Sequence, residues 1–377
     1  MNILIAPDSF KESLSAGEVA DALEAGFKKI LPDAHYVKIP MADGGEGTVQ
    51  SLIDATQGRL KTVAVTAPLG NTVEADFGIS GDGKTAVIEM AAASGLHLVA
   101  PEQRNPLLTT SYGTGELILA ALDEGVEKII LGIGGSATND GGAGMLQALG
   151  VSFTDKSGKE IPFGGGNLHQ ITQADFSRLD SRLQHTQIEV ACDVDNPLCG
   201  EKGAAAVFGP QKGATPQIVA ELDSALEHFA DIIADCCGTD IRNHAGAGAA
   251  GGMGGGLLTL PNVRLQSGIQ IVMETVNLAA HIREADLVIT GEGRMDAQSI
   301  HGKTPVGVAQ TAKQYGKPVI AVVGCLREDY EVVYEHGIDA VFPIIRQTAP
   351  LEHVLAEARE NLISTAQNIA RVMTLSR

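Results

Sequence analysis

One stretch, residues 129–150, constrains the fold most strongly, because in it a glycine-rich turn separates an apolar run from a helical pattern. The apolar run over residues 129–133 has the length and composition of a buried parallel strand. The helical pattern over residues 143–149 stops at Gly150. Open α/β proteins hold anions at such turns, because backbone N–H groups point inward and the helix N-terminus carries partial positive charge. The stretch therefore predicts an α/β fold with an anion site at the turn.

The polar residues of this turn suit a nucleotide phosphate. The candidate nucleotide-binding residues are Gly134, Gly135, Ser136, Thr138, Asn139 and Asp140. The two glycines let the backbone come close to a ligand, and the three side chains that follow can donate hydrogen bonds to phosphate oxygens. The aspartate can either bind a metal or cap the following helix. The alternative is an ordinary strand–helix turn with an Asn-Asp cap.

Composition excludes several classes of function. The chain has 377 residues, enough for two domains, and its net charge of −19 argues against nucleic acids and anionic membranes as partners. Its five cysteines form no Cys-x-x-Cys pair, which predicts free thiols in a reducing compartment. The sequence shows no signal peptide pattern and no apolar run of about 20 residues. We therefore expect a cytoplasmic protein, and a homo-oligomer is compatible with this sequence.

The two ends of the chain have similar patterns, whereas the middle differs. Strand patterns at residues 2–6, 36–39 and 60–66 alternate with helical ones, which predicts a βαβαβ start of a right-handed parallel sheet. The first helix is predicted to begin at Ser15, with Glu18 completing a capping box. Strand and helix patterns alternate again from residue 285 onward. We predict one α/β domain built from residues 1–68 and 283–377, with a second α/β domain, residues 69–282, inserted between them.

A match to the P-loop expression at residues 78–85 is rejected. The match, Gly-x4-Gly-Lys-Thr, requires a strand before it and a helix that begins at the Lys-Thr pair. Here Asp82-Gly83 has the composition of a hairpin turn, and a strand pattern follows. The nearly pure Gly/Ala run at residues 244–256 fits a hinge, a lid or a close-packed helix start equally well.

Charged residues gather in the glycine-rich loops at predicted strand ends. The acidic ones are Asp8, Asp43, Glu46, Asp140, Asp193, Glu292 and Asp296. The basic ones near these loops are Lys11, Lys202, Lys212, Arg294 and Lys303. Carboxylates could hold Mg²⁺ or accept a proton from a substrate hydroxyl, and the cations could bind phosphate or carboxylate. Together these parts are typical of phosphoryl transfer, where positioning and charge neutralisation do most of the catalysis.

Five sequence blocks together resemble the bacterial glycerate kinases of the type I family. The blocks are residues 6–11 (Ala-Pro-Asp-Ser-Phe-Lys), 42–48 (Ala-Asp-Gly-Gly-Glu-Gly-Thr), 134–142 (Gly-Gly-Ser-Ala-Thr-Asn-Asp-Gly-Gly), 192–198 (Cys-Asp-Val-Asp-Asn-Pro-Leu) and 290–296 (Thr-Gly-Glu-Gly-Arg-Met-Asp). They keep the family order along nearly the whole chain. The resemblance implies ATP-dependent, Mg²⁺-assisted phosphorylation of glycerate, most often D-glycerate to 2-phosphoglycerate. It also implies a flavodoxin-like domain made from both termini, and an inserted α/β domain.

The roles of individual residues remain hypotheses beside this resemblance. Asp193 is the first choice for base or metal ligand, and Asp8 and Lys11 are the other catalytic candidates. The substrate-binding candidates are Asp43, Glu46, Arg294 and Lys303. The metal-ligand candidates are Asp193, Glu292 and Asp296. We expect glycerate and ATP to meet in a cleft between the two domains.

Two other classes of function are left open by the residues themselves. One is a nicotinamide-dependent oxidoreductase, although the strand–helix turns carry no Gly-x-Gly-x-x-Gly fingerprint. The other is a non-catalytic protein that closes on a small acid, although its loops would be unusually rich in carboxylates. The sequence does not determine which hydroxyl or enantiomer of glycerate is used.

Overall fold

The computed structural model describes residues 1–45, 47–300 and 302–375. Its contacts divide the chain into two compact units. The first consists of Met1–Asp43, Gln50–Gln57 and Ser267–Arg377, and the second of Gly44–Val49 and Gly58–Gln266. The predicted fold class is confirmed: one unit is a parallel-sheet α/β structure made by both ends of the chain, and the other is mixed α/β. The predicted domain boundaries stay a prediction.

The first unit is built on a five-stranded parallel sheet in the order β15-β13-β11-β1-β2. The strands are β1 (Asn2–Ile5), β2 (His35–Lys38), β11 (Leu287–Thr290), β13 (Val319–Val323) and β15 (Ala340–Pro343). Numbered within this sheet alone, the order is 2-1-3-4-5, the flavodoxin-like topology. The strand order reverses between β1 and β11, and ligands of such sheets bind beyond the carboxyl ends of the strands at that point.

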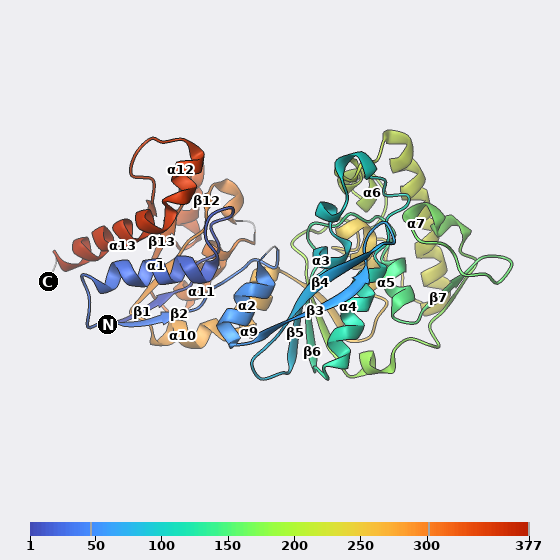
Figure 1. Ribbon diagram of the computed structural model, residues 1–377, viewed down its shortest axis with the longest axis horizontal. Helices are drawn as coiled ribbons and strands as arrows, with labels where there is room; N and C mark the ends of the chain where they lie inside the picture. Colours follow the sequence, from blue (N-terminus) through green and yellow to red (C-terminus); the bar gives the residue numbers. More distant parts are fainter. Residues whose placement is uncertain (46, 301, 376–377) are drawn as a thin grey trace. The chain divides into compact units, whose positions relative to one another are not determined.

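Helices cover both faces of this sheet, as a parallel sheet requires. On one face α1 (Ala16–Lys28) packs against α13 (Ala358–Thr374), so that the blue and red ends of the chain lie together (Figure 1). The predicted capping box of α1 is confirmed, because Ser15 and Glu18 exchange the expected hydrogen bonds. Other helices and short strands of this part are α9 (Gly268–Thr275), α10 (Leu278–Glu284), α11 (Thr304–Gln314), α12 (Leu351–Ala356), β12 (Arg294–Met295) and β14 (Cys325–Leu326).

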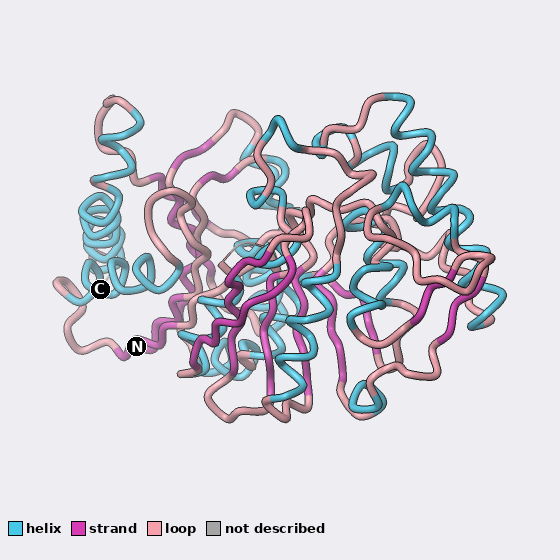
Figure 2. Tube along the Cα trace, turned by 45° about the vertical axis from the view of Figure 1, so that its right-hand side comes forward, coloured by secondary structure: helices cyan, strands magenta, loops and turns pink. Residues whose placement is uncertain are grey.

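The second unit contains a six-stranded mixed sheet in the order β10-β9-β6-β5-β4-β3. The strands are β3 (Arg59–Thr66), β4 (Thr72–Ile79), β5 (Thr85–Glu89), β6 (Lys128–Gly132), β9 (Gln187–Ala191) and β10 (Val263–Gln266). The pairs β3–β4 and β4–β5 are antiparallel, and the remaining pairs are parallel. The strands run beside one another as magenta tubes in Figure 2.

The predicted βαβαβ start is wrong at its third strand. After α2 (Thr48–Thr56) the chain enters β3, which pairs antiparallel with β4 and forms an edge of the second sheet. The strand has alternating exposure, which suits an edge strand with one solvated face. Its partner is the next strand along the chain, so a local hairpin wins over the more distant parallel pairing.

The rejected P-loop is confirmed as a hairpin. β4 and β5 are antiparallel, and the turn between them is closed by a hydrogen bond from the Gly83 N–H to the Ser80 carbonyl. Residues 84–85 continue into β5 rather than into a helix.

The core of the second unit is aliphatic and lies between the sheet and its helices. Those helices and the small β-ribbon are α3 (Ala91–Ser94), α4 (Tyr112–Asp123), α5 (Ala143–Ala148), α6 (Ala204–Phe208), α7 (Pro216–Cys237), α8 (Met253–Leu257), β7 (Ser152–Thr154) and β8 (Gln173–Asp175). Helix α7 inserts Leu226, Phe229 and Ile233 into this core.

Candidate functional site

The glycine-rich turn lies between the end of β6 at Gly132 and the start of α5 at Ala143. Its tip, Gly134 and Gly135, is exposed, whereas the residues after the tip turn inward. Ser136 keeps 6% of its surface exposed, and Thr138 and Asn139 keep none. The backbone of the tip is therefore what a ligand from solvent meets first.

Asp140 braces the turn from inside. Its Oδ2 accepts hydrogen bonds from the backbone N–H and the hydroxyl of Ser111, both at 2.8 Å, and from Gly144 N–H at 3.3 Å. Its Oδ1 accepts from Gly142 N–H at 3.2 Å. Burial raises the pKa of Asp140, and these hydrogen bonds oppose the shift. These contacts tie the turn to the first turns of α4 and α5, and the metal or nucleotide role of this carboxylate stays a prediction.

Lys212 lies directly behind the turn. Its side chain is 1% exposed, and its Nζ donates to Ser136 Oγ and to the Thr138 carbonyl oxygen, both at 2.6 Å. Burial lowers the pKa of Lys212 to about 7, while the negative charge of Asp140 opposes that shift. The sequence offered Lys212 only as one of five scattered cations, with no local signal that it would be buried.

The Gly/Ala run packs against the back of the same turn. A Cβ on Gly251, whose φ is +69°, would collide with the Thr138 carbonyl oxygen, and one on Gly256 would collide with that of Gly141. The run forms a short 3₁₀ turn over Ala249–Gly252 followed by α8, and it is almost wholly buried. Of the three alternatives left open, the close-packed helix start is the one observed. The glycines there let two stretches of backbone touch.

Three neighbouring strands of the second sheet present polar groups at one edge. Glu89 ends β5, the glycine turn follows β6, and the exposed Asp193 follows β9. The registers pair Glu89 with Gly132 and Gly132 with Ala191, so the three strand ends are adjacent. Glu89 Oε1 accepts a hydrogen bond from the Val49 N–H at 3.0 Å.

A cavity of about 630 Å³ opens at this edge. Its walls are Gly44, Gly45, Glu89, Ala91, Ala92, Leu96, His97, Gly132, Gly134 and Gly135. Small residues dominate the lining, so a ligand can approach the backbone closely, and Glu89 and His97 add titratable groups. Neither of these two was named from the sequence, because each lies outside the glycine-rich blocks.

In the first unit, Asp8 follows β1 at the point where the strand order reverses. Its Oδ1 accepts from the Ser9 N–H at 2.6 Å, and its Oδ2 accepts from the Thr304 hydroxyl at 2.7 Å. Burial, with the nearby charge of Asp43, raises the pKa of Asp8 from 3.8 to about 6. At neutral pH the carboxylate is thus ionised, held in one orientation, and a better proton acceptor than an exposed aspartate.

Glu292 and Asp296 follow β11, the neighbour of β1, and share Lys303 as a counter-ion. Lys303 Nζ lies 3.4 Å from Glu292 Oε2 and 3.7 Å from Asp296 Oδ1. Ser299 donates to Glu292 Oε1 at 2.5 Å, and Arg294 Nε lies 3.2 Å from Asp296 Oδ2. Burial, opposed by Ser299 and Lys303, raises the pKa of Glu292 to about 6. Lys303 and Arg294 therefore already pair with the two carboxylates predicted as metal ligands, and that metal role stays a prediction.

For the other candidate residues the structure gives less information. Lys11 is exposed, and Asp43 is half-buried with its charge acting on Asp8. Glu46 lies outside the described residues, so its predicted role is untouched by the structure. In the described parts of the chain, no group of three or more His, Cys, Asp or Glu side chains is arranged to hold a metal ion. The catalytic, substrate and metal roles given to single residues remain predictions.

Comparison with known proteins decides the family. The model of the glycerate kinase family matches residues 3–374. The chain belongs to the glycerate kinase family. A glycerate kinase of Haemophilus influenzae is 68% identical, with 99% of both chains covered. The glycerate 2-kinase of Escherichia coli K12 is 56% identical over 100% of this chain and 98% of that protein.

The fold of this glycerate kinase family member agrees with a solved structure. A Salmonella typhimurium LT2 protein, provisionally assigned as glycerate kinase 2, superposes with a TM-score of 0.93 at 55% identity. The match covers 100% of this chain and 99% of that one. Neither of the alternatives left open by the sequence, an oxidoreductase or a binding protein, is a description that these relatives carry.

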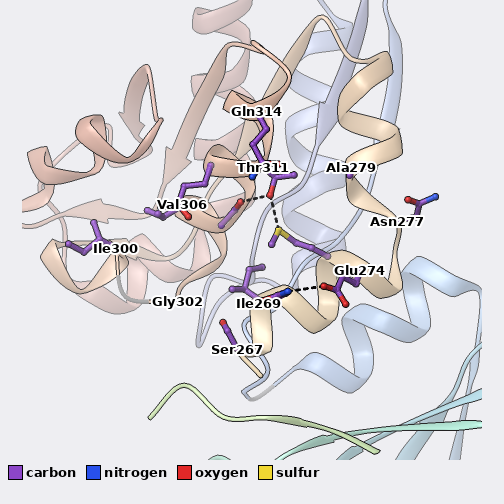
Figure 3. A pocket seen from close by; sticks show the side chains of 14 residues that line it. Ser267, Ile269, Glu274, Asn277, Ala279, Ile300, Gly302, Val306, Thr311 and Gln314 are labelled. Atoms are coloured by element: carbon purple, nitrogen blue, oxygen red, sulfur yellow. Dashed lines mark hydrogen bonds between the residues drawn. The ribbon is translucent and has the colours of Figure 1, made fainter. Parts of the chain in front are cut away.

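A second cavity, of about 620 Å³, lies within the first unit of the glycerate kinase fold (Figure 3). It is bounded by α9 and α11, where Thr311 donates to Met273 Sδ and Gln270 to Glu274 Oε1. None of the candidate residues named from the sequence is among the side chains that line it.

Across the described residues, no helix combines the length and apolarity needed to span a membrane.

Proposed function

We propose that this chain is an ATP-dependent kinase that phosphorylates glycerate, D-glycerate at its 2-hydroxyl, with Mg²⁺. Family membership supports the reaction class, and the name of the Escherichia coli relative supports the 2-position. The observation that carries the proposal is the exposed Gly134–Gly135 tip, which lines a cavity at the carboxyl ends of β5 and β6. Backbone N–H groups of such a tip suit phosphate oxygens.

The acceptor chemistry is proposed for the first unit. Asp8, with a pKa of about 6 and its orientation set by Thr304, is suited to take the proton from a glycerate hydroxyl. Lys11 and Arg294 are exposed cations suited to the glycerate carboxylate, and Arg294 also pairs with Asp296 through Nε. Asp193 remains the first candidate for a second base or for a metal ligand at the ATP phosphates.

The residues present fit a Mg²⁺ ion that is bound jointly by protein carboxylates and ATP phosphates, rather than one held by the protein alone. Mg²⁺ usually keeps several waters and binds one or two carboxylates together with substrate phosphates. Burial is the main cause of the raised pKa values of Asp8 and Glu292, and a smaller contribution comes from neighbouring carboxylates, whose charge a divalent cation would offset. When bound, Mg²⁺ would neutralise charge on the transferring phosphoryl group. Asp193, Glu292 and Asp296 are the proposed protein ligands.

The test is ³¹P NMR of the product after incubation with D-glycerate, ATP and Mg²⁺. We expect a new phosphomonoester signal that coincides with authentic 2-phosphoglycerate, and no signal after addition of a chelator. Parallel reactions with L-glycerate determine the enantiomer. Intact ATP with no new signal would overturn the kinase assignment, a 3-phosphoglycerate signal would overturn the regiochemistry, and a chelator-insensitive rate would overturn the metal requirement.

A further inference from the structure

A buried ammonium group with neutral partners stands behind the glycine turn. The hydrogen-bond acceptors of Lys212 Nζ in the described chain are a hydroxyl, on Ser136, and a carbonyl, on Thr138. Asp140 acts on Lys212 only at longer range, and its own oxygens accept from Ser111, Gly142 and Gly144. Burying a charge without a directly hydrogen-bonded ionic partner is costly. The ammonium form of Lys212 therefore has no anion among its direct acceptors, and an added anion nearby would stabilise it.

The buried polar atoms of the turn are a second indication of a polar ligand. Thr138 Oγ1 and both amide atoms of Asn139 are buried with no hydrogen-bond partner in the described chain. Buried polar atoms are nearly always satisfied in folded proteins, by protein groups, waters or ligands. A turn with unsatisfied buried polar atoms and a buried lysine whose direct acceptors are neutral is suited to bind a polar ligand.

Ser136 connects the buried charge to the exposed tip. Its Oγ accepts a hydrogen bond from Lys212, which leaves the hydroxyl proton of Ser136 as a donor. Ser136 follows the exposed Gly134 and Gly135 directly and is itself still 6% exposed. An anion on the tip can accept that proton, whereas Lys212 cannot reach solvent itself.

We propose that Lys212 is a positioning residue for ATP: it orients the Ser136 hydroxyl toward a phosphate held at the Gly134–Gly135 tip and supplies the positive charge behind it. This inference rests on the proposed function, because it takes the anion to be a nucleotide phosphate. It assigns to the buried lysine the electrostatic part of phosphate binding, and to the glycines the geometric part. A hydrogen bond strengthened by charge is worth more than a neutral one.

Proton uptake should accompany the binding. Without an anion, burial holds the pKa of Lys212 near 7, so at pH 8 the amine is mostly neutral. A phosphate on Ser136 favours the ammonium form and raises this pKa, so one proton passes from buffer to Nζ as ATP binds. Asp140 is the titratable group that faces Lys212 from the turn, and it is buried and held by its own donors. A lysine with a merely structural role would show no such linkage.

The experiment is calorimetric titration of the whole protein with ATP and Mg²⁺, without glycerate, at pH 8 in two buffers of different ionisation enthalpy. The variants are Lys212→Met and the control Lys156→Met, an exposed lysine of the same unit. For Lys212→Met we expect binding about ten- to a hundredfold weaker, because hydrogen bonds to charged groups contribute about 1.5–3 kcal/mol. We also expect the buffer-dependent proton uptake to disappear. The control should match the wild type in both.

Ser136→Ala keeps the test decisive if Lys212→Met does not fold. It removes the connecting hydroxyl but leaves the contact of Lys212 with the Thr138 carbonyl, and it should weaken ATP binding about three- to tenfold. ATP affinity unchanged in Ser136→Ala, or proton uptake unchanged in a folded Lys212→Met, would overturn the inference while the kinase activity of the wild type stands. A wild type that neither binds ATP nor phosphorylates glycerate would instead overturn the proposed function and this inference with it.

Discussion

The two candidate sites are built in opposite ways. In the first unit the site is made of side chains: Asp8, Glu292 and Asp296 at strand ends, partly balanced by Lys303. In the second unit the site is made of backbone, with its cation placed behind the surface at Lys212. We infer from this difference that the two sites have different roles, the first in glycerate binding and proton transfer and the second in phosphate binding. Side chains suit proton transfer and recognition of a small acid, whereas a glycine tip suits a phosphate group that must be approached closely.

The largest expected effect comes from the side-chain site. Asp8→Asn should lower kcat by about 10²–10⁴-fold, because a positioned general base contributes that much. The KM for ATP should change little, since the ATP phosphates are assigned to the glycine turn of the other unit. Steady-state kinetics with Asp33→Asn, an exposed aspartate, as control measures both. If Asp8→Asn had a normal kcat but a greatly increased KM for ATP, Asp8 would act in ATP binding, and the separate roles of the two sites would be contradicted.

A substitution behind the glycine turn should act instead by disrupting backbone packing, which lowers stability. Gly251→Ala places a Cβ against the Thr138 carbonyl at a positive φ, so we expect a loss of about 2–4 kcal/mol in the free energy of unfolding. ATP affinity should fall with it, while kcat at saturating ATP changes less. Urea denaturation and nucleotide titration provide the readouts. Gly158→Ala is a fair control, since its φ is also positive but its Cβ position is open.

The smallest effect is a pair of pH dependences with opposite signs. The pKa of Asp8 is raised from 3.8 to about 6, so the folded state binds more protons between these values. The free energy of unfolding should therefore fall as pH rises through this window. The pKa of Lys212 is lowered from 10.5 to about 7, so there the unfolded state binds more protons and stability should rise with pH.

Each dependence should become smaller in one variant only. Asp8→Asn should reduce the slope of the acidic window, where Glu292 still contributes, and Lys212→Met should reduce the slope of the basic window, each by at most about 1.4 kcal/mol per pH unit. Urea denaturation between pH 4 and 10 measures this. If both variants reduced the slope of the free energy of unfolding in the same pH window, Asp8 and Lys212 would not titrate independently. The proposed contrast between the two sites would then be wrong.

The sequence predicted the parts of these sites that rest on local pattern. The Ser15 capping box, the hairpin at Asp82-Gly83 and the glycine turn after residue 133 each depend on a few neighbouring residues, and the structure shows all three. The acidic residues at strand ends were also visible, because a carboxylate after an apolar run is a local signal.

What the sequence missed depends on distant contacts. Lys212 is buried by residues 74 and 76 positions away, and nothing in its own neighbourhood distinguishes it from an exposed lysine. The partner of β3 was wrong because strand pairing is decided by competition between a hairpin and a crossover. The role of Gly251 depends on Thr138, more than a hundred residues earlier.

The position of β1 has a consequence for how the protein is made. This strand lies inside its sheet, yet one of its two neighbours, β11, follows it by 284 residues in register. At about 5–20 residues per second, a ribosome needs roughly 15–60 s to deliver that neighbour after β1 has emerged. The second unit is almost continuous in the chain, so its core can close in that interval. During each round of translation, the first segment made is thus among the last to find its place, and its apolar strand is the one that chaperones would need to protect.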